Sequence, residues 1–422
     1  MDYTKRIADF VVETNYSTIP PKALEVAKTA ILDCIGVTLA GSKEESARIC
    51  GLLVREEGAK SESTVIGQGF KSSALMAAFA NGTAAHALDY DHSFALMGQP
   101  TAALIPAIFP LAEALHTDGR HLLLAYVIGF EVTAKLARSI PDHMSQGGWH
   151  STGTLGSLGA TAACAKLLGL DTGAVQMALG IASSMASGMV SNFGSMTKPL
   201  HAGLASRNGV LAAKLAQNGF TANSMILERP KGFFEVYCRD LSYDPVPMES
   251  LGASLELVDR GIRIKPYPCG GLTHSAIDAL LEMRARYDIA PESIEAIKVG
   301  VTQQTYNMLV SYVGVPETGL QGKFSMPYIL ARALVDGKVS LGAFTDEAVR
   351  DTSVKEVAEK IYMEHDPELK EGEKGGRPTR VVIRLKNGGT LSQRVDYAKG
   401  SKEAPLSPLA MQGKFMECAV RA

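Results

Sequence analysis

The sequence predicts a mainly α protein with two domains, a large all-helical domain and a smaller inserted α+β domain. Three observations support this fold class. Apolar residues recur at helical spacing through about residue 250. Strand-like segments begin after about residue 255, and the pattern becomes helical again after about residue 400. We therefore expect the all-helical domain over 1–254 plus 400–422, and the α+β domain over 255–399.

Apolar spacing predicts the helices of the first domain in chain order. The segment 22–41 repeats apolar residues at intervals of three and four, and Gly41 is expected at its C-cap. Several later segments are apolar on nearly all sides, which is typical of core helices in a large bundle. The later helical segments are 100–116, 119–140, 153–170 and 172–187, and 201–220 is expected to allow close contacts through its Ala and Gly residues. Gly153, Gly156 and Gly159 recur every three residues and are expected to allow close helix contacts.

The inserted domain combines strands and helices. Strands are expected in 255–268 and 293–304, with a helix in 273–287 between them. Further helices are expected in 325–337 and 345–365. The segment 377–397 is expected to form a hairpin that turns at Asn387-Gly388-Gly389. The last segment, 407–420, is helical and is expected to pack against the first domain.

Composition excludes several classes of function. The 42 basic and 44 acidic side chains are nearly balanced and form no block, which argues against nucleic-acid and membrane-surface partners. The six cysteines show no metal-ligand or paired spacing, so a reduced chain without a metal or thiol-redox role is expected. The N-terminal segment is an amphipathic helix start, and apolar runs are interrupted before membrane-span length. We expect a soluble, cytoplasmic protein.

One group of ionisable residues lies in the Gly/Ala-rich stretch 77–92. It places Asp89 and Asp91 between His86 and His92, with Ser93 and Gln99 following. Small residues allow neighbours to approach, and a half-buried carboxylate beside another has a raised pKa, as a general acid or base requires. The alternative is a solvated acidic helix end with a capping aspartate.

Three further clusters carry ionisable groups in apolar sequence. His150 precedes a helix that Ser151 or Thr152 could cap, and the helix dipole would lower its pKa. Lys198 and His201 flank Pro199, which is expected at position N1 of a helix. The third cluster, in the irregular stretch KPYPCGGLTH, contains Lys265, Cys269 and His274.

Each cluster also has a purely structural reading. His150 could be a helix cap, Lys198 a surface lysine, His201 a packed core histidine and Cys269 a buried thiol. Taken together, a carboxylate, imidazoles and ammonium groups suit proton transfer on an anionic substrate. The lysines would bind carboxylates and stabilise a developing enolate, while Asp89 and His150 would move the proton.

The four clusters, in this order, resemble the MmgE/PrpD family, which includes 2-methylcitrate dehydratase, cis-aconitate decarboxylase and iminodisuccinate epimerase. The resemblance extends over the whole chain. It implies a helical domain with an α+β lid, an active site between them, a homodimer and no metal or organic cofactor. Its motifs here are AILDCIGVTLAGS, NGTAAHALDYDHSF, GWHSTGTLGSLGATAACAKLLGL, MTKPLHAGLASRNGVLAAKLAQNGFTA, KPYPCGGLTH, GKFSMPYILARALVDG and KFMECA.

The resemblance also implies roles for residues. The family's active-site positions correspond to Asp89, Ser93, His150, Lys198 and Lys265, and a lid tyrosine corresponds to Tyr312. We expect Asp89, His150 and Lys198 to be catalytic. The residues expected to bind substrate are Ser93, Gln99, His201, Lys265, His274 and Tyr312.

Two departures from the family pattern affect the expected reaction. Gln99 stands where dehydratase-like and decarboxylase-like members have a histidine, and Gly270 stands where decarboxylase-like members have another. Glutamine can bind a carboxylate but cannot transfer a proton. We expect a 2-methylcitrate dehydratase-like lyase acting on a small di- or tricarboxylate. The alternative is an epimerase of a dicarboxylate such as iminodisuccinate. Cis-aconitate decarboxylation and a silent carboxylate-binding dimer rank below these.

Overall fold

The computed structural model describes residues 2–94, 98–140, 143, 146–238, 243–312, 314–372 and 376–422, and its chain is mainly α-helical. The chain divides into two compact units, one formed by 1–263 with 407–422 and the other by 264–406. The domain ranges expected from the sequence end seven to nine residues earlier. The difference arises because the stretch up to Arg263 still belongs to the helical unit, where Arg263 pairs with Ser93 in a β-bridge.

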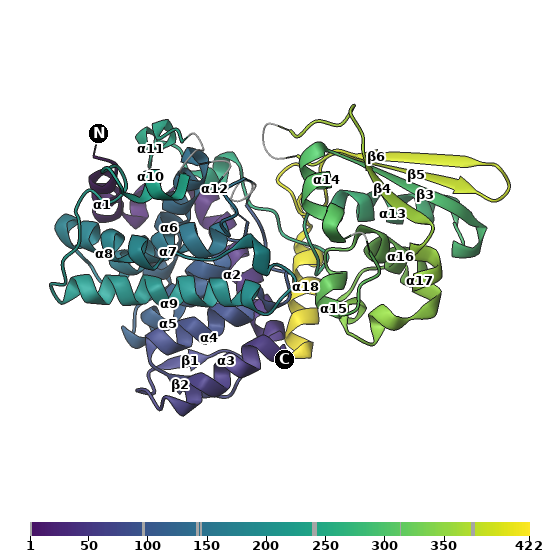
Figure 1. Ribbon diagram of the computed structural model, residues 1–422. Helices are drawn as coiled ribbons and strands as arrows, with labels where there is room; N and C mark the ends of the chain where they lie inside the picture. Colours follow the sequence, from purple (N-terminus) through teal and green to yellow (C-terminus); the bar gives the residue numbers. More distant parts are fainter. Residues whose placement is uncertain are drawn as a thin grey trace. The chain divides into compact units, whose positions relative to one another are not determined.

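Helices account for most of the first unit (Figure 1). The amphipathic N-terminal segment forms a helix, as expected, and the closing segment packs against α2. The α-helices are α1 (Tyr3–Glu13), α2 (Pro21–Gly41), α3 (Glu45–Glu56), α4 (Ala74–Ala87), α5 (Thr101–Ala114), α6 (Gly119–Ser139), α7 (Ser151–Leu167), α8 (Thr172–Met185), α9 (Thr197–Gln217), α10 (Phe233–Cys238), α11 (Val246–Glu249), α12 (Glu256–Asp259) and α18 (Pro408–Arg421). Two 3₁₀ helices, η1 (Tyr16–Thr18) and η2 (Val190–Asn192), join them.

Small residues let the central helices α4, α5, α6, α7 and α9 pack closely. The expected role of the α7 glycines is confirmed. A Cβ on Gly159 would overlap the Thr133 hydroxyl, and one on Gly156 would lie 2.9 Å from the Ala103 methyl. Gly41 is not a C-cap, because it is the last residue of α2 and the cap is Ser42. Its lack of a side chain instead makes room for the Ala84 carbonyl of α4.

The first unit is not entirely helical. Strands β1 (Ser63–Val65) and β2 (Phe70–Ser72) form an antiparallel hairpin. Glu113 at the end of α5 anchors it by accepting hydrogen bonds from the Thr64 amide (2.7 Å) and hydroxyl (2.8 Å). Three-residue strands are too short to give the alternating pattern by which a strand is recognised in a sequence.

The second unit contains a four-stranded sheet in the order β4-β3-β5-β6. Its strands are β3 (Ile294–Val301), β4 (Ile361–His365), β5 (Thr379–Leu385) and β6 (Thr390–Val395). Its helices are α13 (His274–Tyr287), α14 (Gln303–Leu309), α15 (Gly319–Gly322), α16 (Met326–Asp336) and α17 (Thr352–Ala358), with 3₁₀ helices η3 (Pro291–Ser293), η4 (Val310–Tyr312), η5 (Leu341–Phe344) and η6 (Ala348–Arg350). Helix α13 packs against β5 and β6, and α16 packs against α13 and β4 (Figure 1).

Two sequence predictions in this region are wrong, and the others, which include the hairpin, are confirmed. The expected helix in 345–365 ends at Ala358, and Ile361–His365 is a strand that pairs in parallel with β3. The expected strand in 255–268 is instead the short helix α12 followed by irregular backbone. The hairpin is confirmed, because β5 and β6 pair in antiparallel and Gly388 adopts a positive φ of 86° in the turn.

Two further expectations can be compared with the structure. All six cysteines are free and buried, in agreement with a chain that has no disulfide framework. Within the part of the chain that the structure describes, no helix combines the length and the apolar character needed to cross a membrane.

Candidate active site

Asp89 lies just beyond the C-terminal end of α4 and is held in a strained backbone conformation. Its φ is +52°, in the left-handed region that a non-glycine residue rarely occupies, and the residue is only 4% exposed. Such outliers concentrate at functional sites, where the surrounding structure maintains them. The backbone turn brings the Asp89 carboxylate toward α9.

Lys198 on α9 provides the cation for this carboxylate. Its ammonium binds Asp89 Oδ1, and it lies 5.2 Å from the centre of the Phe193 ring. Lys198 is 4% exposed, so it is not the surface lysine of the structural alternative. Pro199 is the third residue of α9 and not the first, which places Lys198 inside the first helical turn. A buried ammonium at this position can receive an anionic substrate.

His150 is the N-cap residue of α7, and neither Ser151 nor Thr152 caps the helix because both lie inside it. The imidazole is fully enclosed. Burial holds the pKa of His150 well below its usual value, and the nearby His86, Lys198 and His201 lower it further. Among the described residues, Nε2 of His150 has no hydrogen-bond partner. The site therefore contains a neutral imidazole with one uncommitted nitrogen.

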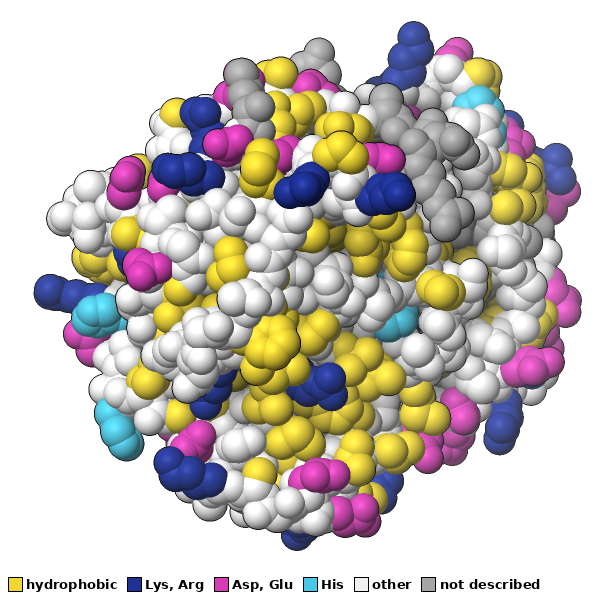
Figure 2. Space-filling view, turned by 60° about the vertical axis from the view of Figure 1, so that its left-hand side comes forward, with side chains coloured by type: hydrophobic (Ala, Val, Ile, Leu, Met, Phe, Trp, Pro, Cys, Tyr) yellow, Lys and Arg dark blue, Asp and Glu magenta, His cyan; other side chains and the backbone are white. Residues whose placement is uncertain are grey.

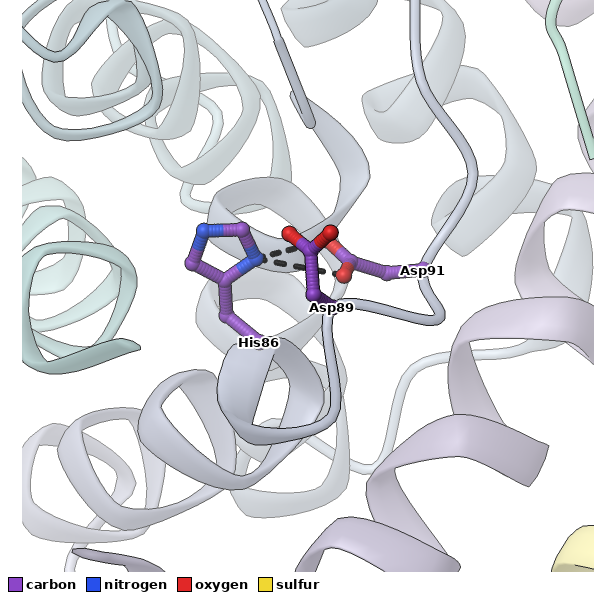
Figure 3. Close-up of side chains that lie close together, drawn as sticks. All are labelled: His86, Asp89 and Asp91. Atoms are coloured by element: carbon purple, nitrogen blue, oxygen red, sulfur yellow. Dashed lines mark hydrogen bonds and ion pairs between the residues drawn. The ribbon is translucent and has the colours of Figure 1, made fainter. Parts of the chain in front are cut away.

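His86 and Asp91 form a second buried pair beside Asp89 (Figure 3). Nδ1 of His86 lies 2.9 Å from Asp91 Oδ2, and burial lowers the pKa of the imidazole. The His86 ring stacks on His150, with ring centres 5.5 Å apart. From the sequence, His86 is only a residue that flanks the two aspartates. Its position in the last turn of α4 does not reveal that its ring faces His150.

A cation could be held by the carboxylates of Asp89 and Asp91 together with His86. One donor atom from each of the three lies within 4.8 Å of the others. The chain's own groups already engage all three side chains, because Lys198 binds Asp89 and His86 binds Asp91.

His201 continues the group on the other side of His150. The two Nδ1 atoms are 3.0 Å apart, and burial lowers the pKa of His201 to about 4. The observed partner of His201 is another histidine and not a substrate. The predicted role of His201 in substrate binding therefore stays a prediction.

The loop from Asp89 to His92 is fixed from behind by residues that the sequence analysis did not identify. Asp33 of α2 accepts hydrogen bonds from the His92 backbone (3.1 Å) and lies 2.9 Å from His92 Nδ1. Lys414 of α18 binds Asp33 Oδ1 at 2.6 Å and donates to the Tyr90 carbonyl at 2.8 Å. Asp33 and His92 are 59 residues apart in the chain and Lys414 and Tyr90 are 324 apart, so no local pattern predicts their association.

Ser93 and Gln99 are both half-buried. The backbone N–H of Gln99 donates to the Thr152 hydroxyl (3.1 Å), which connects Gln99 to α7. Residues 95–97 between them lie outside the described part of the chain. The roles of Ser93 and Gln99 in substrate binding stay predictions.

The remaining predicted residues belong to the second unit. Lys265 is 2% exposed, and His274 at the start of α13 lies with Nε2 3.3 Å from the Cys269 carbonyl. Cys269 is buried. Tyr312 is in η4, with its ring centre 5.5 Å from that of Phe324, and burial raises its pKa. Their roles in substrate binding stay predictions.

Gly270, the second departure from the family pattern, is closely surrounded. A Cβ there would lie 3.3 Å from both the Lys323 carbonyl oxygen and the Phe324 ring. The Gly270 amide also donates to that carbonyl (2.9 Å). A histidine at this position would require these neighbours to move.

Comparison with known proteins agrees with the resemblance. The model of the MmgE/PrpD N-terminal domain matches residues 5–245, and that of the C-terminal domain matches 267–422. The chain belongs to the MmgE/PrpD family.

Relatives of this MmgE/PrpD chain include enzymes that are lyases by name. It is 30% identical to the cis-aconitate decarboxylase of Mus musculus over 92% of this chain and 81% of that protein. It is 29% identical to the Homo sapiens cis-aconitate decarboxylase over 93% of this chain and 83% of that protein. It is 30% identical to the Aspergillus terreus (strain NIH 2624 / FGSC A1156) cis-aconitate decarboxylase over 91% of this chain and 83% of that protein.

The structure thus brings together Asp89, Lys198, His150 and His201 in the helical unit of an MmgE/PrpD protein, with His86 as an additional member. The group offers an ammonium to bind an anion and a neutral imidazole to accept a proton. These are the two functions needed to remove a proton next to a carboxylate.

Proposed function

We propose that this chain is a lyase that removes a proton from a carbon next to a carboxylate, and that its reaction is the dehydration of a 2-methylcitrate-like hydroxy acid. The observation that carries this proposal is His150, a neutral, enclosed imidazole with an unpaired Nε2 near the Lys198–Asp89 ion pair. The names of its relatives support a lyase.

Each residue of the group has a defined part in this reaction. Lys198 binds the substrate carboxylate and stabilises the negative charge that develops as the carbon–hydrogen bond breaks. Asp89 holds Lys198 in place and shares its charge. Nε2 of His150 takes the proton. Because burial and the neighbouring cation oppose a charge on His150, the imidazole gives this proton up again readily.

The protonation state of the site favours dehydration over decarboxylation. In dehydration the proton for the leaving hydroxide comes from the substrate carbon itself, whereas decarboxylation removes no such proton and must draw one from water to protonate the carbanion that loss of CO₂ leaves. His150 is neutral, and Gln99 cannot donate a proton in the way that a histidinium can. Decarboxylation is the second candidate because the relatives at 29–30% identity are named cis-aconitate decarboxylases.

Incubation in deuterated water with 2-methylcitrate, citrate, cis-aconitate and iminodisuccinate separates the candidates. Dehydration gives an alkene that absorbs in the near ultraviolet. Carbon dioxide release from cis-aconitate would replace our proposal by decarboxylation. Deuterium incorporation with inversion and no loss of water would identify the epimerase instead, and unchanged substrates would indicate a silent binding protein.

Substitution then tests the location of the site. His150→Ala and Lys198→Ala should each lower turnover by about a hundredfold or more. His121→Ala is the matched control, because the side chain of His121 is 66% exposed at the start of α6. Equal activity of all three variants would show that the chemistry takes place elsewhere.

We also propose that the chain is a homodimer, as the family resemblance implies. Hydrophobic side chains gather on the face shown in Figure 2. The exposed hydrophobic residues of the helical unit include Ile49, Leu52 and Leu53 of α3, which are 47–55% exposed. Light scattering coupled to size-exclusion chromatography measures the mass directly, and a monomeric mass of 44.8 kDa would contradict the proposal.

A further inference from the structure

His150 and His201 are joined nitrogen to nitrogen. Their Nδ1 atoms are 3.0 Å apart. A hydrogen bond between two imidazole nitrogens needs the proton on one of them and a lone pair on the other. While both rings are neutral, they are therefore held in opposite tautomers. The burial that lowers the pKa of both rings favours this neutral state.

The two ends of this pair differ in their surroundings. His150 is fully enclosed, and its Nε2 has no hydrogen-bond partner among the described residues. His201 keeps 5% of its surface exposed. Gly188 makes room for both rings, because a Cβ there would lie 3.1 Å from His201 and 3.5 Å from His150. The pair thus has an enclosed end at His150 and an open end at His201.

We propose that His150 and His201 form a two-ring proton relay between the reacting carbon and solvent. The substrate carbon–hydrogen bond breaks, and its proton forms a bond to Nε2 of His150. The proton on Nδ1 of His150 passes to Nδ1 of His201. The proton on Nε2 of His201 then leaves to water, and both rings are neutral again with their tautomers exchanged.

The reverse transfer resets the pair and completes the reaction. Water protonates Nε2 of His201, the Nδ1 proton returns to His150, and Nε2 of His150 releases its proton to the departing hydroxide. Overall the substrate loses one proton and one hydroxide as water. The hydrogen from carbon stays on Nε2 of His150 until it leaves with the hydroxide as water.

The first test measures the solvent isotope effect on turnover, as the ratio of the rates in water and in deuterated water. It rests on the proposed function and uses whichever of the four acids reacts. In His201→Asn the amide oxygen can still accept from Nδ1 of His150 but cannot pass a proton on. The ratio of the rates in water and in deuterated water should fall toward one, because the solvent-derived protons on Nδ1 of His150 and Nε2 of His201 no longer move with the reaction.

The control is His143→Asn. His143 is also a buried histidine, and it is bonded to the Thr154 hydroxyl (2.7 Å) and not to His150. Its ratio should equal that of the wild type. An unchanged ratio in His201→Asn would overturn the relay even if the dehydration itself is confirmed.

The second test needs neither substrate nor a variant. The ¹⁵N spectrum of histidine-labelled protein should show His150 and His201 as opposite neutral tautomers at pH 7. If both carry their protons on Nε2, the Nδ1 atoms share no proton and the relay is wrong. Absence of reaction with all four acids would contradict the proposed function alone, because the tautomers are measured independently of it.

Discussion

Replacing Lys414 by methionine should destabilise the helical unit strongly. Lys414 comes from the C-terminal helix α18, yet it binds two groups that hold the Asp89–His92 loop. Its ammonium is 2.6 Å from Asp33 Oδ1 and 2.8 Å from the Tyr90 carbonyl, and it lies 4.0 Å from the centre of the Tyr90 ring. Methionine keeps most of the chain length but none of these polar interactions.

The magnitude follows from burial. The Asp33 side chain is fully buried and that of Lys414 is 5% exposed. Burial by itself would raise the pKa of Asp33, and Lys414 and His92 together keep it below its usual value. Removing one partner of such a pair leaves a buried charge without its main compensation, which costs about 3–5 kcal/mol. An exposed pair such as Lys5–Asp9 contributes less than about 1 kcal/mol.

Urea unfolding followed by Trp149 fluorescence measures this change, since Trp149 is the one tryptophan of the chain and belongs to the helical unit. Lys5→Met is the matched control, with the same substitution in an exposed ion pair. Lys414→Arg keeps the charge and should recover part of the stability. A loss below about 1 kcal/mol in Lys414→Met would refute the reasoning, because it would show that the pair is not buried.

Two other predictions concern packing and pH. Gly159→Ala should destabilise the protein by about 1–3 kcal/mol in urea unfolding, because the new methyl overlaps the Thr133 hydroxyl. Gly413→Ala, at an exposed position of α18 where the new Cβ has no atom within 4 Å, should be neutral or stabilising, and equal losses in both variants would contradict the packing argument. Burial raises the pKa of Glu131 to about 7. The folded state then holds a proton that the unfolded state releases near its usual pKa of 4.5. The contribution of Glu131 to stability is therefore greatest below pH 4.5 and falls by about 3 kcal/mol as the pH rises through 7. Glu131→Gln should remove this fall, and identical pH profiles for variant and wild type would show that Glu131 does not cause it.

Much of the fold could be predicted because its causes are local. Apolar spacing identified the long helices, and the Asn-Gly-Gly turn identified the β5–β6 hairpin. The strand β4 was mistaken for the end of a helix. Its residues Ile361–His365 gain their strand conformation from pairing with β3, some sixty residues earlier, and the sequence shows no sign of that partner.

The same distinction applies to the candidate site. The sequence by itself determined which residue types the site contains. Asp89, His150 and Lys198 were expected together because their motifs have a common chemical meaning, and the structure places these three in one buried group. Its composition in acids, imidazoles and ammonium groups is a property of the chain alone.

Only the tertiary structure decided how these groups are paired and protonated. The contacts Lys198–Asp89, His86–Asp91, His150–His201 and Lys414–Asp33 join residues from different helices and loops. A pKa depends on the solvent that a folded protein excludes and on the charges that it brings near, and both are set by packing across the chain. The neutral state of His150 is therefore a consequence of the folded unit, which encloses the ring and places Lys198 beside it.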